Sequence, residues 1–254
     1  MIGGRRLRYA TSTAVGAATL GLAAAACSGS PADETETSSD PEQVSAIQVC
    51  GGGLVSSSAG SSLERVLESS RFVIREEKEN ANVSSIAKAL ENAYRAGSKV
   101  RDTSIPSCDI SGALKNADSD RYYPTASLRF RATSKNSGVP DYMPEAKDSG
   151  TKSWASFREY TIAFDCVSSR VGSTNEIPLR ISAEFRSKWD KGQAEESTLA
   201  PDYAALAHSA ALSVAEKLGC DGRGGLPERP DGLPKPESVP GATPTSGAGD
   251  VPAG

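Results

Sequence analysis

The stretch Ile177-Pro-Leu-Arg-Ile-Ser-Ala-Glu-Phe-Arg186 alternates apolar and polar side chains. A period of two is typical of a β-strand with one face in the core and the other in water. Residues 126–132 and 160–166 show the same alternation. Strands of this kind belong to antiparallel sheets, because the strands of parallel sheets are buried on both faces. The three stretches predict the centre of an antiparallel sheet, to which Phe72-Val73-Ile74 adds a short strand.

Helical periods lie on both sides of these strands in the sequence. The apolar residues after Asn82, a helix-capping residue type, recur every 3.6 positions. A second such period covers residues 201–218, and a shorter helix is expected after a capping box that begins at Ser61. The predicted fold class is α+β, with an antiparallel sheet of about four strands and helices packed on one face.

The N-terminus has the features of a secretory signal peptide. Three arginines in the first nine residues precede a mildly apolar run over 10–26 that ends in small side chains. This run falls short of the roughly 20 strongly apolar residues that a membrane-spanning helix needs. Leu22-Ala-Ala-Ala-Ala-Cys27 resembles the lipobox of bacterial lipoproteins, in the alanine-rich style of actinobacteria. The resemblance covers residues 1–27 alone, and Ala24 stands where the commonest pattern has leucine.

This resemblance implies that Cys27 is lipidated on its sulfur and becomes the acylated N-terminus. Each buried methylene group contributes about 0.8 kcal/mol, so several acyl chains give a firm anchor. The lipid bilayer is therefore an expected partner, contacted through acylated Cys27. The expected location is the extracytoplasmic face of the cell membrane.

Four further cysteines lie at spacings of 58, 58 and 54 residues. In an exported protein an even number of cysteines predicts disulfides, and the absence of a Cys-x-x-Cys motif disfavours zinc. Three pairings are possible. We favour Cys50 with Cys108 and Cys166 with Cys220, because each bridge then ties a helix-bearing segment to its neighbour in the sequence.

Composition divides the chain into four segments. Residues 1–26 are the signal peptide, and residues 27–43 form an acidic tether with too little apolar surface to fold. Residues 44–221 form one α+β domain, and the Pro- and Gly-rich residues 222–254 are expected to be a disordered tail. The net charge of −4 disfavours nucleic acid as a partner, because nucleic-acid binding needs a clustered positive surface.

The sequence has no motif of a recognisable catalytic class. It lacks Gly-x-Ser-x-Gly, Ser-x-x-Lys and His-Glu-x-x-His. Its single histidine, His208, is expected on the surface of the last helix. No catalytic residue, cofactor or metal ligand is predicted. A carboxylate pair, as glycosidases use, converges only in space, so an envelope hydrolase is the alternative function.

Two groups of residues favour binding. The alternation places four arginines on the solvent face of one sheet, where they would form a basic patch for an anionic ligand or partner. They are Arg129, Arg131, Arg180 and Arg186. The same charges would also serve to keep a wet sheet face soluble. Tyr142 and Trp154, in the long connection before residue 160, are typical of a contact surface, or else fold back onto the core. The expected function is a binding or interaction module of the cell envelope.

Overall fold

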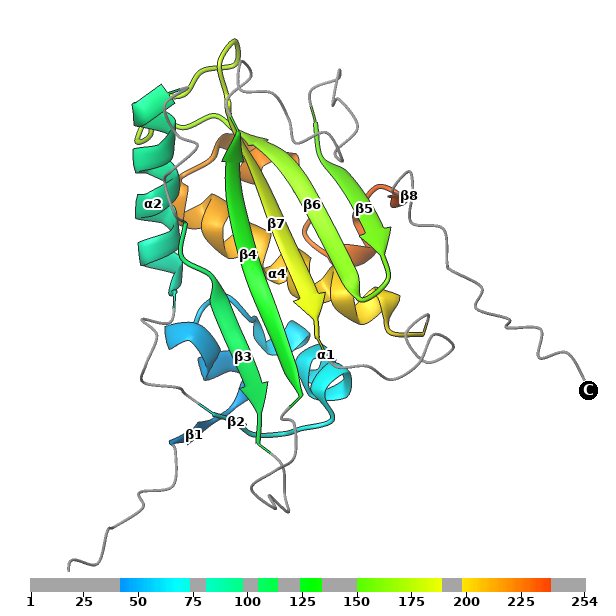
Figure 1. Cartoon of the computed structure of the whole chain (residues 1–254). Helices are drawn as coiled ribbons and strands as arrows, with labels where there is room; N and C mark the ends of the chain where they lie inside the picture. Colours follow the sequence, from blue (N-terminus) through cyan, green and yellow to red (C-terminus); the bar gives the residue numbers. More distant parts are fainter. Residues whose placement is uncertain are drawn as a thin grey trace, which may run out of the picture. The chain divides into compact units, whose positions relative to one another are not determined.

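The computed structural model of the protein describes residues 42–73, 81–97, 105–113, 124–133, 150–188 and 198–238 (Figure 1). These residues belong to one unit, which spans Asp40–Gly254. The signal peptide, Cys27 and Tyr142 lie outside the described residues. Within the described ranges, no helix combines the length and the apolar character that crossing a membrane requires.

A single sheet of eight strands forms the centre of this unit, in the order β1-β2-β3-β4-β7-β6-β5-β8. In chain order the strands are β1 (Gln43–Val44), β2 (Phe72–Val73), β3 (Cys108–Gly112), β4 (Thr125–Thr133), β5 (Lys152–Ser156), β6 (Glu159–Cys166), β7 (Leu179–Ser187) and β8 (Glu237–Ser238). The first seven are joined by antiparallel pairs, and β8 pairs with β5 in parallel. The predicted α+β class with an antiparallel sheet is confirmed. The predicted number of about four strands was wrong, because the additional strands are too short to show alternation.

The three strands predicted from alternation lie together as β4, β7 and β6. Phe130 pairs with Ala183, which pairs with Ile162, and all three side chains are buried. Ile177, expected in the core-facing row of the third strand, is instead 54% exposed. β7 starts only after Pro178, a residue without the N–H group that a strand ladder needs.

Three α-helices lie on one face of the sheet (Figure 1). They are α1 (Ser57–Leu67), α2 (Val83–Ala96) and α4 (Ala200–Leu218). The side chain of Asn82 caps α2 as predicted, and Gly219 ends α4 in the left-handed conformation. α1 begins earlier than predicted, because Ser56 and not Ser61 is its N-cap.

The main core fills the space between these helices and the sheet. Figure 1 shows α4 crossing behind β6 and β7. The ring of Phe185, on β7, lies 5.6 Å from that of Tyr203, on α4, and both side chains are buried. Four alanines of α4 are also buried, so the helix lies close to the sheet. The fold thus leaves the opposite face of the central strands free of these helices.

Both predicted disulfides are present. Cys50–Cys108 joins the 3-10 helix η1 (Ala46–Gly51) to β3, and Cys166–Cys220 joins the end of β6 to the residue that follows Gly219. The Cα–Cα distances of 5.7 and 4.9 Å lie within the usual range for disulfides. The second bridge fixes the end of α4 against the sheet.

The prediction of a disordered tail from residue 222 was wrong for residues 222–238. Leu226 is buried, the hydroxyl of Ser153 donates to the carbonyl of Pro234 at 2.7 Å, and β8 pairs with β5. Gly224 has a φ of +69°, and a Cβ there would lie 2.6 Å from Cδ2 of Phe164. Only glycine lets the main chain come this close to the ring of Phe164. In the sequence, this glycine was counted as part of a composition typical of disorder.

Candidate functional site

The open face of the sheet is the face of β4, β5, β6 and β7 that α1, α2 and α4 leave uncovered, and Figure 1 views the sheet from this side. Its side chains alternate with those of the core, and strand pairing sets them in rows. One row holds Ser127, Arg186 and Glu159; the next Arg129, Glu184, Thr161 and Trp154; the next Arg131, Ser182, Ala163 and Lys152; and the last Arg180 and Asp165.

The four predicted arginines do lie on this one face, but they are not a simple basic patch. Arg180 donates to both carboxylate oxygens of Asp165, at 2.8 and 3.1 Å. Arg186 donates to Glu159 from two of its nitrogens, one of them at 2.8 Å. Carboxylates on β6 therefore neutralise two of the four cations, which corrects the picture of four solvated charges. The predicted co-location holds.

Glu184 has three of the four arginines as neighbours. Its carboxylate is 3.7 Å from Nη2 of Arg131 and 3.5 Å from Nε of Arg186, and Arg129 is its partner in the strand register. The residue is only 6% exposed. Burial raises the pKa of Glu184, the negative charge of Glu159 adds to the rise, and the three arginines oppose it.

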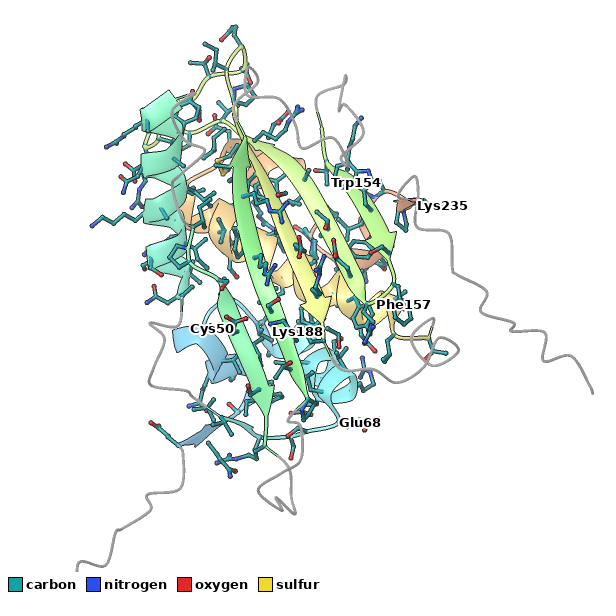
Figure 2. The ribbon with its side chains drawn as sticks, in the orientation of Figure 1. Cys50, Glu68, Trp154, Phe157, Lys188 and Lys235 are labelled. Carbon is teal, nitrogen blue, oxygen red and sulfur yellow. A yellow bond between two sulfur atoms is a disulfide. The ribbon has the colours of Figure 1, made fainter. Side chains whose placement is uncertain are left out.

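Trp154 lies in the same row as Glu184, at the end opposite Arg129. The sequence places it in a long connection, whereas the structure places it in β5, where it is 5% exposed (Figure 2). It is buried on the open face and takes no part in the main core. Trp154 is thus buried, as the alternative of an aromatic that folds back expected, and its register partner on β6 is Thr161.

Three buried side-chain atoms within the described ranges have no hydrogen-bond partner. They are Oγ of Ser127, Nε1 of Trp154 and Oε1 of Glu184. All three belong to residues of the open face. Buried polar atoms are satisfied in the great majority of cases, so a group of three on one face asks for a specific explanation. A bound ligand, partner or water on this face would supply the missing hydrogen bonds.

Arg129 differs from the other three arginines of the open face in its contacts. It is half-buried, and it has no hydrogen bond and no ion pair within 4 Å among the described residues. Its electrostatic partner is Glu184, which is shared with Arg131 and Arg186. The guanidinium of Arg129 is therefore available to an anion.

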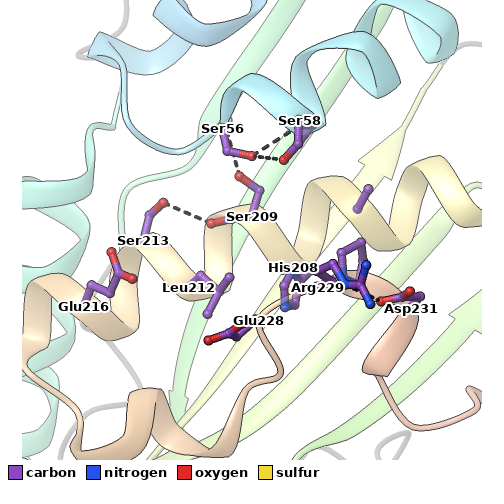
Figure 3. Close-up of a pocket in the computed structure, with 13 residues that line it drawn as sticks. Ser56, Ser58, His208, Ser209, Leu212, Ser213, Glu216, Glu228, Arg229 and Asp231 are labelled. Carbon is purple, nitrogen blue, oxygen red and sulfur yellow. Dashed lines mark hydrogen bonds and ion pairs between the residues drawn. The ribbon is translucent and has the colours of Figure 1, made fainter.

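A concave region lies on the helical side of the molecule (Figure 3). This pocket has a volume of about 600 Å³ and is formed by the start of α1, one stripe of α4 and residues 228–231. Its lining includes Ser56, Ser209 and His208. The size is suitable for a small molecule.

The serine hydroxyls of this pocket are already hydrogen-bonded within the protein. Ser209 accepts from the amide of Ser56 at 2.8 Å and donates to the carbonyl of Leu54 at 3.0 Å. Ser213 donates to the carbonyl of Ser209. These bonds tie α1 to α4, so the pocket is a structural joint with satisfied hydroxyls. The open face, whose buried polar atoms lack partners, is the better candidate site.

The prediction that His208 lies on the surface of the last helix was wrong. It is 3% exposed, and its Nε2 lies 2.8 Å from the carbonyl oxygen of Pro227. Burial lowers the pKa of His208, and the hydrogen bond to Pro227 offsets part of this. The segment around Pro227 that covers His208 was not expected, because the Pro- and Gly-rich composition of residues 222–238 is typical of disorder.

Comparison of the chain with protein-family models, curated proteins and solved structures found no match. Among the described residues, no three histidine, cysteine or acidic side chains come together in a way that would hold a metal ion. The site must therefore be interpreted from its own geometry.

Proposed function

We propose that the protein is a lipid-anchored, extracytoplasmic binding protein that takes an anionic ligand on the open face of its sheet. The observation that carries this proposal is that three buried polar atoms without a hydrogen-bond partner lie on the same sheet face as the four arginines. An anionic end of the ligand would bind Arg129, and a hydrogen-bond acceptor would bind the indole N–H of Trp154. These residues end one row across four strands, at about 5 Å per strand, which favours an elongated ligand.

The two disulfides support the extracytoplasmic part of this proposal. Such bridges persist in oxidising compartments and are rare in the bacterial cytosol. They agree with a signal peptide that exports the chain. The lipid anchor rests on the resemblance of residues 22–27 to a lipobox.

Replacing Cys27 by serine tests the anchor. In a bacterium that processes lipoproteins, the unaltered chain is expected in the membrane fraction and to take up a radiolabelled fatty acid. The Cys27→Ser chain is expected to lose the label, because serine offers no thiol for acylation. Ser28→Ala is the matched control and should stay labelled. Retention of the label by Cys27→Ser would contradict the proposed anchor.

Replacing Arg129 by alanine tests the site. Inorganic sulfate is a suitable probe for the anionic end, and hydrogen bonds between charged groups contribute about 1.5–3 kcal/mol each. We expect Arg129→Ala to weaken sulfate binding at least tenfold, and Arg129→Ala/Arg131→Ala to weaken it further. Titration calorimetry at constant ionic strength measures the effect.

Arg95→Ala is the control for this experiment, because Arg95 lies on α2 and pairs with Glu91 four residues before it. Its sulfate affinity should equal that of the unaltered protein. A parallel series with vesicles of anionic or of zwitterionic phospholipid distinguishes a free anion from a lipid headgroup. An unaltered protein that binds neither sulfate nor anionic vesicles would contradict the proposed site.

The open face also supports a second candidate, an envelope hydrolase. Glu159 and Glu184 both contact Arg186, and a buried carboxyl with a raised pKa is suited to act as a general acid. A panel of 4-nitrophenyl glycosides tests this function. Turnover that is lost in both Glu159→Gln and Glu184→Gln, but kept in Arg129→Ala, would favour the hydrolase over the binding protein.

A further inference from the structure

Glu184 occupies the position that an anionic ligand would need. It faces Arg129 across the strand pair and lies within 4 Å of Arg131 and Arg186. The carboxylate is buried, yet its Oε1 makes no hydrogen bond, although Nε of Arg186 lies 3.5 Å away. The protein thus holds its own anion among these cations without satisfying it fully.

We propose that an oxyanion binds at Arg129 together with one proton, which neutralises Glu184. This inference rests on the proposed function, because it concerns the same face. The carboxylate of Glu184 gains a proton from solvent, and the incoming anion replaces it as the counter-charge to the arginines. No covalent bond other than the new O–H is made or broken.

Electrostatics provides the reason for this coupling. Two negative charges that share one partly buried site cannot both be stabilised, so the arrival of one raises the cost of ionising the other. Burial already raises the pKa of Glu184, and an arriving anion would act in the same direction. The neutral carboxyl then offers an O–H donor to an oxygen of the ligand, which would satisfy the unpartnered group.

The charged neighbours of Glu184 come from three strands. Arg129 and Arg131 extend from β4, Arg186 from β7, and Glu159 from β6. Glu159 stays committed to Arg186, and its negative charge adds to the preference of Glu184 for a proton. Arg180 and Asp165 form a separate pair two rows away. No described helix packs on this face.

The ligand class follows from the groups that would contact it. Arg129 and a protonated Glu184, which are partners across β4 and β7, are both hydrogen-bond donors. They favour an oxyanion rich in acceptor oxygens, such as a sulfate, phosphate or carboxylate group. A cation or an amine at the same place would face the arginines and meet no negative charge on Glu184 once that residue is neutral.

Sulfate binding as a function of pH tests the inference. Sulfate keeps its charge between pH 5 and pH 8, so any change in its affinity belongs to the protein. In the unaltered protein we expect affinity to fall as pH rises above the pKa of Glu184, approaching tenfold per pH unit for one linked proton. Calorimetry in buffers of different ionisation enthalpy should report the uptake of up to one proton per sulfate.

Glu184→Gln is the decisive variant, because glutamine imitates the neutral carboxyl. It should bind sulfate at pH 8 as tightly as the unaltered protein does at the low-pH limit of its affinity, with no slope and without the uptake of that proton. His208→Gln removes the only histidine, on the helical side of the molecule, and should keep the slope. Thermal unfolding confirms that each variant is folded.

The outcomes separate the two proposals. Sulfate binding that depends on Arg129 but has no slope, or a slope that survives in Glu184→Gln, would overturn the proton coupling and leave the binding site standing. Absence of sulfate binding at every pH, in the unaltered protein and in Glu184→Gln alike, would overturn both.

Discussion

Replacing Phe185 by alanine is expected to lower the free energy of unfolding by about 3–5 kcal/mol, as is usual for a large aromatic side chain removed from a core. Phe185 is fully buried on the central strand β7, and its ring lies against Tyr203 of α4. Its loss leaves a cavity between the sheet and its longest helix, which the surrounding main chain cannot fill. Urea unfolding followed by tryptophan fluorescence measures the change.

Phe157→Ala is the matched control. Phe157 is 50% exposed at the turn between β5 and β6, where its ring lies under the guanidinium of Arg158 (Figure 2). Its removal should change the free energy of unfolding by no more than about 0.5 kcal/mol, as for surface positions in general. Equal losses from Phe157→Ala and Phe185→Ala would show that the core is not where the structure places it.

Replacing both Cys166 and Cys220 by serine is expected to cost about 4 kcal/mol, from the loop entropy that a bridge over 54 residues removes from the unfolded chain. The effect should also be local. Without the bridge, the end of α4 keeps only non-covalent contacts near the end of β6, such as the hydrogen bond from Ser168 to the carbonyl of Leu218. The segment that covers His208 follows directly after Cys220. We expect amide hydrogens over residues 221–238 to exchange faster.

The other disulfide provides the comparison. Cys50 and Cys108 enclose a loop of similar length, with a sequence separation of 58 residues, so their replacement by serine should cost a similar free energy. Exchange over residues 221–238 should then stay slow under native conditions. A loss of stability without this difference in local exchange would show that the Cys166–Cys220 bridge does not hold the C-terminal segment.

The regular parts of the fold follow from sequence periodicity alone. The alternation in β4, β6 and β7 and the helical period of α2 and α4 arise because each of these elements has one buried and one exposed side. The strands β1, β3, β5 and β8 have two to five residues each, and their positions depend on pairing with distant segments. Pairing of this kind cannot be predicted from the local sequence.

The candidate site was predicted in part, for the same reason. Alternation placed Arg129, Arg131, Arg180 and Arg186 on one face, and it also placed Glu184 there. It gave no indication that Asp165 lies beside Arg180, or Glu159 beside Arg186, because these contacts depend on the register of β6 against β7. The alternation of 160–166 places Asp165 on that face, and Glu159 continues the same row one residue before this stretch. Only the register was needed to bring each carboxylate to its arginine.

The two-residue strand β8 has a consequence for how copies of the protein meet. Without it, β5 would end the sheet with a full row of unpaired amide and carbonyl groups, which is a template for joining the sheet of a second molecule. β8 takes up part of that row at Trp154 and Ala155. In the proposed lipid-anchored form, in which many copies would share one plane, this short strand would limit edge-to-edge aggregation.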